Sequence, residues 1–137
     1  MHLLLLTILG WIAVIDARTH RIANKAVVSL AVTGLATVDL QNFDAGKQLK
    51  AAMIVLVIGL LLSIFCGIGM GDVKLIVVLA LFLLPPDLAM YRRFSLIVCL
   101  FAFAYAFYLS RGKIRQSVKI PLAPAIFFGT IITLIAK

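Results

Sequence analysis

The sequence predicts an all-α membrane protein in which about six transmembrane helices form one bundle. Of its 137 residues, 64% are apolar and 13% are charged, whereas an average soluble domain is about 45–50% apolar and about 25% charged. A soluble domain of this length buries too small a fraction of its surface to hide so much apolar area. Charged residues leave these uncharged stretches: 1–15, 26–38, 51–71, 75–86, 94–110 and 120–136.

The first stretch is too short to cross a bilayer by itself, because a perpendicular helix needs about 20 residues to span about 30 Å of hydrocarbon. Residues 1–15 supply about 22 Å, at about 1.5 Å for each residue. We therefore expect the first helix to continue about one turn beyond Asp16, which places this carboxylate below the membrane interface. The apolar start resembles a signal peptide but has no preceding Lys or Arg, which favours a retained helix.

The next three stretches predict the second, third and fourth helices, of which only 51–71 is long enough by itself to span the membrane. The fourth ends at Pro85-Pro86, because proline cannot continue the hydrogen bonds of a helix. A full span counted back from Pro86 places Asp72 and Lys74 within membrane depth. The last two stretches predict the fifth and sixth helices.

Lys and Arg residues in short loops predict orientation, because cytoplasmic loops carry an excess of them. The connections between helices 1 and 2, 3 and 4, and 5 and 6 contain Arg18, Arg21, Lys25, Lys74, Arg111, Lys113, Arg115 and Lys119. The opposite side holds only Lys47, Lys50, Arg92, Arg93 and Lys137. This bias predicts that both termini lie outside and that Asp16 and Asp72 share the cytoplasmic face. The net charge of +8 fits it, and no basic cluster has the aromatic platforms of a nucleic-acid site, so no nucleic-acid partner is expected.

The acidic residues are five aspartates, because the chain has no Glu. Asp39, Asp44 and Asp87 lie in predicted outside loops beside Asn, Gln, Gly or Pro, which is typical of turns, and we expect no chemical role for them. Asp16 and Asp72 instead interrupt apolar stretches. Ionisable residues within the membrane are candidates for functional sites, because charge is costly to keep there.

Residues 67–74 read Gly-Ile-Gly-Met-Gly-Asp-Val-Lys. Alternating glycines disfavour a helix and let the backbone approach a ligand or another helix closely. Because non-helical backbone at membrane depth needs protein or water around it, one interpretation is a wet cavity that contains Asp72. The other is that Asp72 caps the start of the fourth helix and the glycines form a loop. The two roles are compatible.

Asp16 and Asp72 together can divide the work of amide hydrolysis. An ionised carboxylate takes a proton from water, while a protonated one donates to the carbonyl oxygen or the leaving amine. No other catalytic set competes, because the two histidines are isolated and Cys66 and Cys99 are far apart, without metal-site or CxxC spacing. We therefore expect neither a metal nor a cofactor.

Three motifs resemble those of the type IV prepilin peptidases, which are membrane aspartyl proteases of the GxGD type. Residues 69–75, Gly-Met-Gly-Asp-Val-Lys-Leu, fit the family's GxGDxKL element. Asp16 followed by residues 22–24, Ile-Ala-Asn, fits D-x(5)-I-P-N, with Ala23 in place of the proline. Residues 119–124, Lys-Ile-Pro-Leu-Ala-Pro, are similar to the family's I-P-F-G-P stretch, with Leu and Ala in place of Phe and Gly.

The resemblance implies a prepilin leader peptidase whose catalytic pair is Asp16 and Asp72. The residues that shape or support its cleft are then Gly69, Gly71, Lys74, Asn24 and Pro121. The implied partners are the lipid bilayer and a pilin-like precursor, whose short basic leader is cut at the cytoplasmic face of the bacterial inner membrane. Larger relatives carry an extra region with paired CxxC motifs and methylate the new N-terminus. We expect a single peptidase domain over 1–137 without that region, similar to the short peptidases of Flp (tight-adherence) pili.

Alternatives stay open at this level. Lys74 either tunes Asp72 or anchors its helix at the membrane interface. Ala23 in place of proline leaves room for a degenerate peptidase that binds leaders without cutting them. From a different class, a non-enzymatic subunit of a secretion or pilus assembly system, or a small transporter, uses Asp16 and Asp72 to handle protons or ions.

Overall fold

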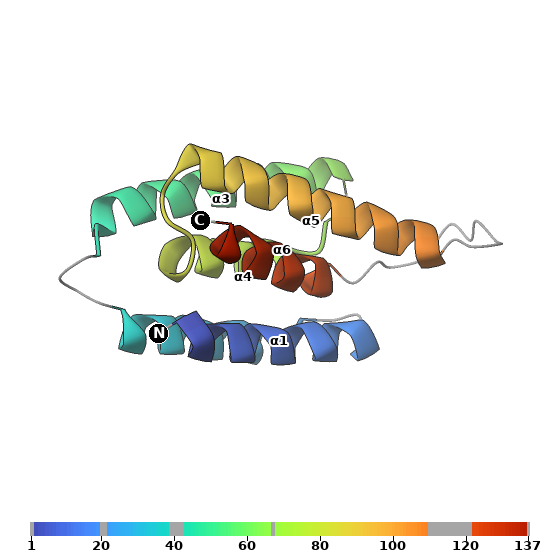
Figure 1. Ribbon diagram of the computed structural model, residues 1–137, viewed down its shortest axis with the longest axis horizontal. Helices are drawn as coiled ribbons and strands as arrows, with labels where there is room; N and C mark the ends of the chain where they lie inside the picture. Colours follow the sequence, from blue (N-terminus) through green and yellow to red (C-terminus); the bar gives the residue numbers. More distant parts are fainter. Residues whose placement is uncertain (1, 20–21, 39–42, 67, 110–121, 137) are drawn as a thin grey trace.

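The computed structural model describes residues 2–19, 22–38, 43–66, 68–109 and 122–136, and these residues form six helices (Figure 1). The helices are α1 (His2–Thr19), α2 (Asn24–Thr37), α3 (Ala45–Cys66), α4 (Met70–Phe82), α5 (Leu88–Leu109) and α6 (Ala123–Ile135). The described residues contain no β-strand. The prediction of an all-α bundle is therefore confirmed.

Successive helices run in opposite directions, so the bundle has two distinct ends (Figure 1). At one, which we call end A, α1, α3 and α5 finish and α2, α4 and α6 begin. At the other, which we call end B, α2, α4 and α6 finish and α3 and α5 begin. Asp16 in the last turn of α1 and Asp72 in the first turn of α4 both lie at end A.

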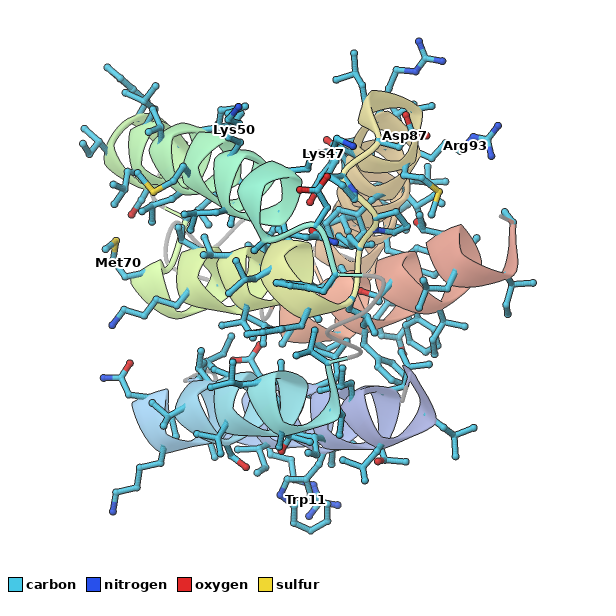
Figure 2. All side chains as sticks on the ribbon, turned by 90° about the vertical axis from the view of Figure 1, so that its left-hand side faces the viewer. Trp11, Lys47, Lys50, Met70, Asp87 and Arg93 are labelled. Carbon is cyan, nitrogen blue, oxygen red and sulfur yellow. The ribbon has the colours of Figure 1, made fainter. Side chains whose placement is uncertain are left out.

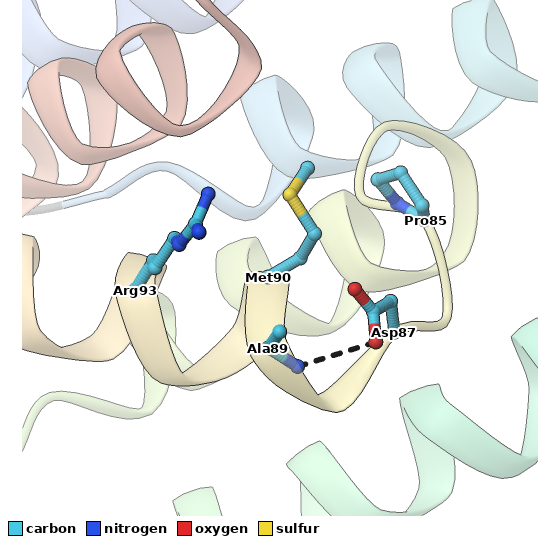
Figure 3. Close-up of a pocket in the computed structure, with 5 residues that line it drawn as sticks. All are labelled: Pro85, Asp87, Ala89, Met90 and Arg93. Atoms are coloured by element: carbon cyan, nitrogen blue, oxygen red, sulfur yellow. Dashed lines mark hydrogen bonds between the residues drawn. The ribbon is translucent and has the colours of Figure 1, made fainter. Parts of the chain in front are cut away.

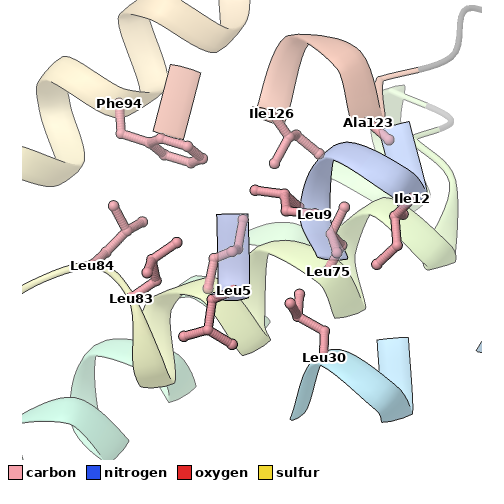
Figure 4. Close-up of a cluster of buried hydrophobic side chains, with 11 residues drawn as sticks. Leu5, Leu9, Ile12, Leu30, Leu75, Leu83, Leu84, Phe94, Ala123 and Ile126 are labelled. Carbon is pink, nitrogen blue, oxygen red and sulfur yellow. The ribbon is translucent and has the colours of Figure 1, made fainter. Parts of the chain in front are cut away.

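The helices pack as two groups of three, α1–α6–α5 and α2–α4–α3, which are joined by the contact between α1 and α2. The helix α6 packs between α1 and α5, α4 packs between α2 and α3, and α1 contacts α2. Their buried side chains form one cluster, in which Leu9, Leu75 and Ile126 are completely inaccessible (Figure 4). In a bilayer such a core is held by close van der Waals packing, because lipid tails are as apolar as leucine.

Glycines allow several helix pairs to approach closely, as small residues do in membrane bundles. A Cβ atom on Gly34 of α2 would lie 2.7 Å from the Phe82 ring of α4. A Cβ on Gly59 of α3 would lie 2.6 Å from Val73 Cγ1. These positions have no room for a larger residue, so the glycines determine how closely α4 packs against both neighbours.

The outer surface of the bundle is strongly apolar. Trp11 of α1 projects away from the bundle and is 67% exposed (Figure 2). Among the described helices, α3 alone is long and apolar enough over residues 45–65 to cross a membrane, and little of it is buried, whereas α6 is apolar but shorter. Exposed apolar area of this extent is typical of a surface that contacts lipid or protein.

The helix boundaries differ instructively from those expected. The helix α1 ends at Thr19, so the prediction that it continues about one turn beyond Asp16 is confirmed. The uncharged stretches 51–71 and 75–86 misplace the boundary between the third and fourth helices. The helix α3 ends at Cys66, and α4 already begins at Met70. Charged residues end an apolar stretch without ending a helix, because a side chain can be polar while its backbone keeps helical hydrogen bonds. The helix α5 likewise begins at Leu88, ahead of the two arginines.

Candidate active site

Asp16 is a buried carboxylate that joins α1 to α6. Its side chain is 4% exposed, and its Oδ2 atom accepts a hydrogen bond from the backbone N–H of Ala123 at 3.2 Å. Ala123 is the first residue of α6, where N–H groups have no partner within the helix and the helix dipole favours negative charge. The start of α6 therefore provides a favourable position for an ionised Asp16.

Asp72 lies in the first turn of α4 but does not cap this helix. The N-cap residue is Gly69, and no side chain caps the helix. The interpretation in which Asp72 caps the fourth helix is therefore wrong. The physical reason is register, because the helix begins at Met70 and the Asp72 backbone N–H already bonds to Gly69 O at 3.0 Å. The Asp72 side chain is partly buried, and its Oδ1 atom has no hydrogen-bond partner among the described residues.

The structure brings the two carboxyl groups together at end A. They are close enough that the charge of Asp16 acts directly on the Asp72 carboxyl group. Their helices, α1 and α4, do not form one of the main packed pairs. Two like charges held this close disfavour ionisation of both at once. The pair can therefore hold one proton and one negative charge, as acid–base hydrolysis requires.

Gly69 and Gly71 give the site space. A Cβ on Gly69 would lie 2.9 Å from Asp72 Oδ2, and a Cβ on Gly71 would lie 3.0 Å from the Cβ of Ile22. The backbone of Gly69 has φ −61° and ψ 134°, which is extended backbone that any residue adopts. At this position glycine leaves room beside the Asp72 carboxyl group and is not needed for an unusual backbone conformation.

Lys74 makes its described side-chain hydrogen bond to α2. Its side chain is exposed, and its Nζ atom donates a hydrogen bond to Asn24 Oδ1 at 3.2 Å. Asn24 is the first residue of α2, so this bond ties the start of α4 to the start of α2. Lys74 and Asn24, which the sequence analysis expected to support the cleft, therefore contact each other. Lys74 lies two positions after Asp72 in the sequence.

A family model described as the type IV leader peptidase family matches residues 3–135. The chain belongs to this family. It is therefore a membrane protein and an aspartic-type peptidase of prepilins, as the motifs predicted. No curated protein and no solved structure gives a match.

In this leader peptidase the sequence did not reveal two contacts of the site. The backbone N–H of Ala123 carries no side-chain signal, although Pro124 at the second helical position is typical of a helix start. The second contact that the sequence did not reveal involves Ser63 of α3. Its Oγ atom donates to Ile68 O at 2.8 Å and so fixes the segment that leads into Gly69.

Other candidate residues of the peptidase lie elsewhere. Pro121 and Asp39 are outside the described residues. Asp44 and Asp87 lie at end B, where Asp87 lines a pocket of about 300 Å³ with Pro85, Ala89, Met90 and Arg93 (Figure 3). Asp87 Oδ1 accepts the Ala89 N–H at 3.3 Å, which is a helix-start contact. In the described part of the chain, no three His, Cys, Asp or Glu side chains gather as metal ligands would.

Proposed function

We propose that Asp16 and Asp72 are the catalytic pair that hydrolyses the leader of a pilin-like precursor. The observation that carries this proposal is the meeting of a buried and a partly buried aspartate at end A, close enough to interact electrostatically. One ionised carboxylate takes a proton from water, and the other, protonated, donates to the scissile carbonyl oxygen.

The substrate we propose is a precursor with a short basic leader followed by an apolar stalk. Cleavage takes place at the cytoplasmic face of the bacterial inner membrane, and residues 1–137 act as one peptidase domain of the kind found in Flp pilus systems. The excess of Lys and Arg in the three connections at end A supports this orientation, because such residues favour the cytoplasmic side. Gly69 and Gly71 support the proposal by leaving room beside Asp72.

The test uses the full chain purified in lipid bilayers with a recombinant precursor of this kind, and cleavage is followed by mass spectrometry. Asp16→Asn and Asp72→Asn each lower the cleavage rate about 10²–10⁴-fold, the usual contribution of a general acid or base. Asparagine keeps the side-chain size and one acceptor oxygen, so the bond from Ala123 can persist and the fold is retained.

Asp87→Asn is the matched control, because it makes the same chemical change at a helix start of end B. Its cleavage rate stays within about twofold of the unsubstituted protein, since general acid–base catalysis does not involve it. Wild-type cleavage by folded Asp16→Asn or Asp72→Asn protein contradicts the proposed pair. A purified unsubstituted chain that cleaves no precursor favours the non-enzymatic alternative.

A further inference from the structure

The two aspartates have unequal surroundings. Asp16 is almost completely buried and receives the Ala123 N–H directly on Oδ2. This donor belongs to the first turn of α6, so the bond and the helix dipole both favour the negative charge. The hydrogen bond and the helix dipole therefore favour the ionised form of Asp16, against the cost of its burial.

Asp72 also lies in the first turn of a helix, and the dipole of α4 favours its negative charge as well. However, its buried Oδ1 atom receives no hydrogen bond from the described residues. A buried charged oxygen without a partner is more costly than a neutral one. The dipole is common to both sites, so the direct donor and the buried unpartnered oxygen distinguish them.

The other described charged residues do not offset this difference in hydrogen bonding between Asp16 and Asp72. Lys74, two residues from Asp72, directs its Nζ atom to Asn24. Arg18 of α1 and Lys25 of α2 are exposed at end A. The helix α3 carries its lysines, Lys47 and Lys50, in its first turns at end B. Among the described residues, Asp16 of α1 is thus the charged group that acts on Asp72, and its negative charge favours a proton on Asp72.

We infer that the pair is divided at neutral pH into an ionised Asp16, which is the general base, and a protonated Asp72, which is the general acid. Ala123 is the positioning residue, because its N–H holds the Asp16 carboxylate. The inference rests on the proposed function and assigns a separate role to each member of the pair.

The roles give a balanced reaction. Asp16 takes one proton from water as the water oxygen bonds to the scissile carbonyl carbon. The carbonyl π electron pair moves to the carbonyl oxygen, which takes the proton of Asp72 and leaves a neutral diol. When the C–N bond breaks, its electron pair stays on nitrogen, which takes the proton from Asp16. One diol hydroxyl returns its proton to Asp72, and a carboxylic acid and an amine leave.

The sequence allows the protonation state of Asp72 to be measured without mutation. Asp72-Val73 is the one Asp-Val step in the chain. In protein made with uniformly ¹³C-labelled Asp and ¹⁵N-labelled Val, the aspartate signals correlated to a valine nitrogen across the peptide bond therefore belong to Asp72. Solid-state NMR of the full chain in bilayers then gives the chemical shift of the Asp72 carboxyl carbon.

The same experiment with ¹⁵N-labelled Ala reports Asp16, because the Asp-Ala steps are Asp16-Ala17 and Asp44-Ala45. The Asp44→Asn variant removes the second signal and so assigns the first. In the unsubstituted protein, the signal of Asp44, which is exposed and paired with Lys47, provides the reference position of an ionised carboxylate.

At neutral pH, we expect the Asp72 carboxyl carbon at the shift of a protonated acid and the Asp16 carboxyl carbon at the shift of a carboxylate. An Asp72 signal in the carboxylate range, or an Asp16 signal in the protonated range, overturns the assignment. The cleavage assay with the asparagine variants is separate. If both variants are inactive while Asp72 is ionised, the catalytic pair stands and the division of roles fails.

Discussion

The aspartates at the two ends of the bundle have partners at very different distances along the chain. At end B, Asp44 Oδ1 accepts the Lys47 N–H at 3.1 Å, and its Oδ2 lies 2.9 Å from Lys47 Nζ. Asp87 bonds to Ala89. At end A, Asp16 bonds to Ala123, 107 residues away, and interacts with Asp72 on another helix.

This difference separates helix-start contacts from a candidate active site. Asp44 and Asp87 are exposed, and each accepts a hydrogen bond from an N–H at the start of the helix that follows it. Such a contact is determined by the local sequence alone. A carboxylate buried between helices has lost most of its water, so its state depends on the groups that other helices supply. Burial and long-range partners, rather than residue type, distinguish the two ends.

Glycine substitutions test whether space beside the carboxylate matters only at end A. Gly69→Ala places a Cβ 2.9 Å from Asp72 Oδ2, so the flexible carboxylate moves, whereas Gly46→Ala places one at an ordinary 3.5 Å from Asp44 Oδ1. A displacement of about 1 Å at a reacting group can cost about 10²-fold in rate, and we expect Gly69→Ala to lose at least about tenfold in cleavage. Gly46→Ala keeps the rate, and alanine stabilises its helix by about 0.4–1 kcal/mol.

The measurements are precursor cleavage and thermal unfolding of both variants in bilayers. Equal cleavage rates for the two variants, with both proteins folded, contradict a special need for space beside Asp72.

Interhelix hydrogen bonds at each end provide a second contrast. Lys74→Met removes the bond to Asn24 Oδ1 at end A, and Arg93→Met removes the bond from Arg93 Nη1 to Ala136 O at end B. Each change costs about 0.5–1.5 kcal/mol of stability. Only Lys74→Met should also lower cleavage, by several-fold, because its helix start carries Asp72.

A double-mutant cycle of Lys74→Met with Asn24→Ala, followed by thermal unfolding, measures the pair. We expect a coupling energy of about 0.5–1.5 kcal/mol. Additive effects of the two substitutions would show that the bond contributes nothing.

The smallest effect concerns pH at end B. The hydrogen bonds and charge of Lys47 hold the pKa of Asp44 below its ordinary value of 3.8. A lowered pKa in the folded state means that the pair stabilises the protein above pH 3.8 and that this contribution is lost as the pH falls through the folded-state pKa. The Asp44→Asn variant lacks the ion pair at every pH, so its unfolding temperature changes less on acidification.

Because both side chains of the pair are exposed to solvent, we expect this difference to be smaller than that caused by Arg93→Met. Thermal unfolding of the two proteins between pH 6 and pH 3 (about one unit below the ordinary aspartate value) measures it. Identical pH profiles for the two proteins contradict the role of the pair.

Much of the fold followed from local information. The apolar stretches predicted the helices, because each segment in a bilayer must satisfy its own backbone hydrogen bonds. The length of the first stretch placed the end of α1 beyond Asp16, as observed at Thr19. The start of α4 was misplaced because Asp72 and Lys74 interrupt hydropathy without interrupting the helix.

The sequence by itself determined the helical membrane character, the family motifs and the two aspartates that interrupt apolar stretches. Tertiary structure alone decided that Ala123 donates to Asp16 and that Lys74 bonds to Asn24. The physical reason is that these contacts join backbone and side-chain atoms from helices far apart in sequence. Hydropathy reports the solvent that a segment prefers, whereas hydrogen bonds between helices depend on how the segments pack.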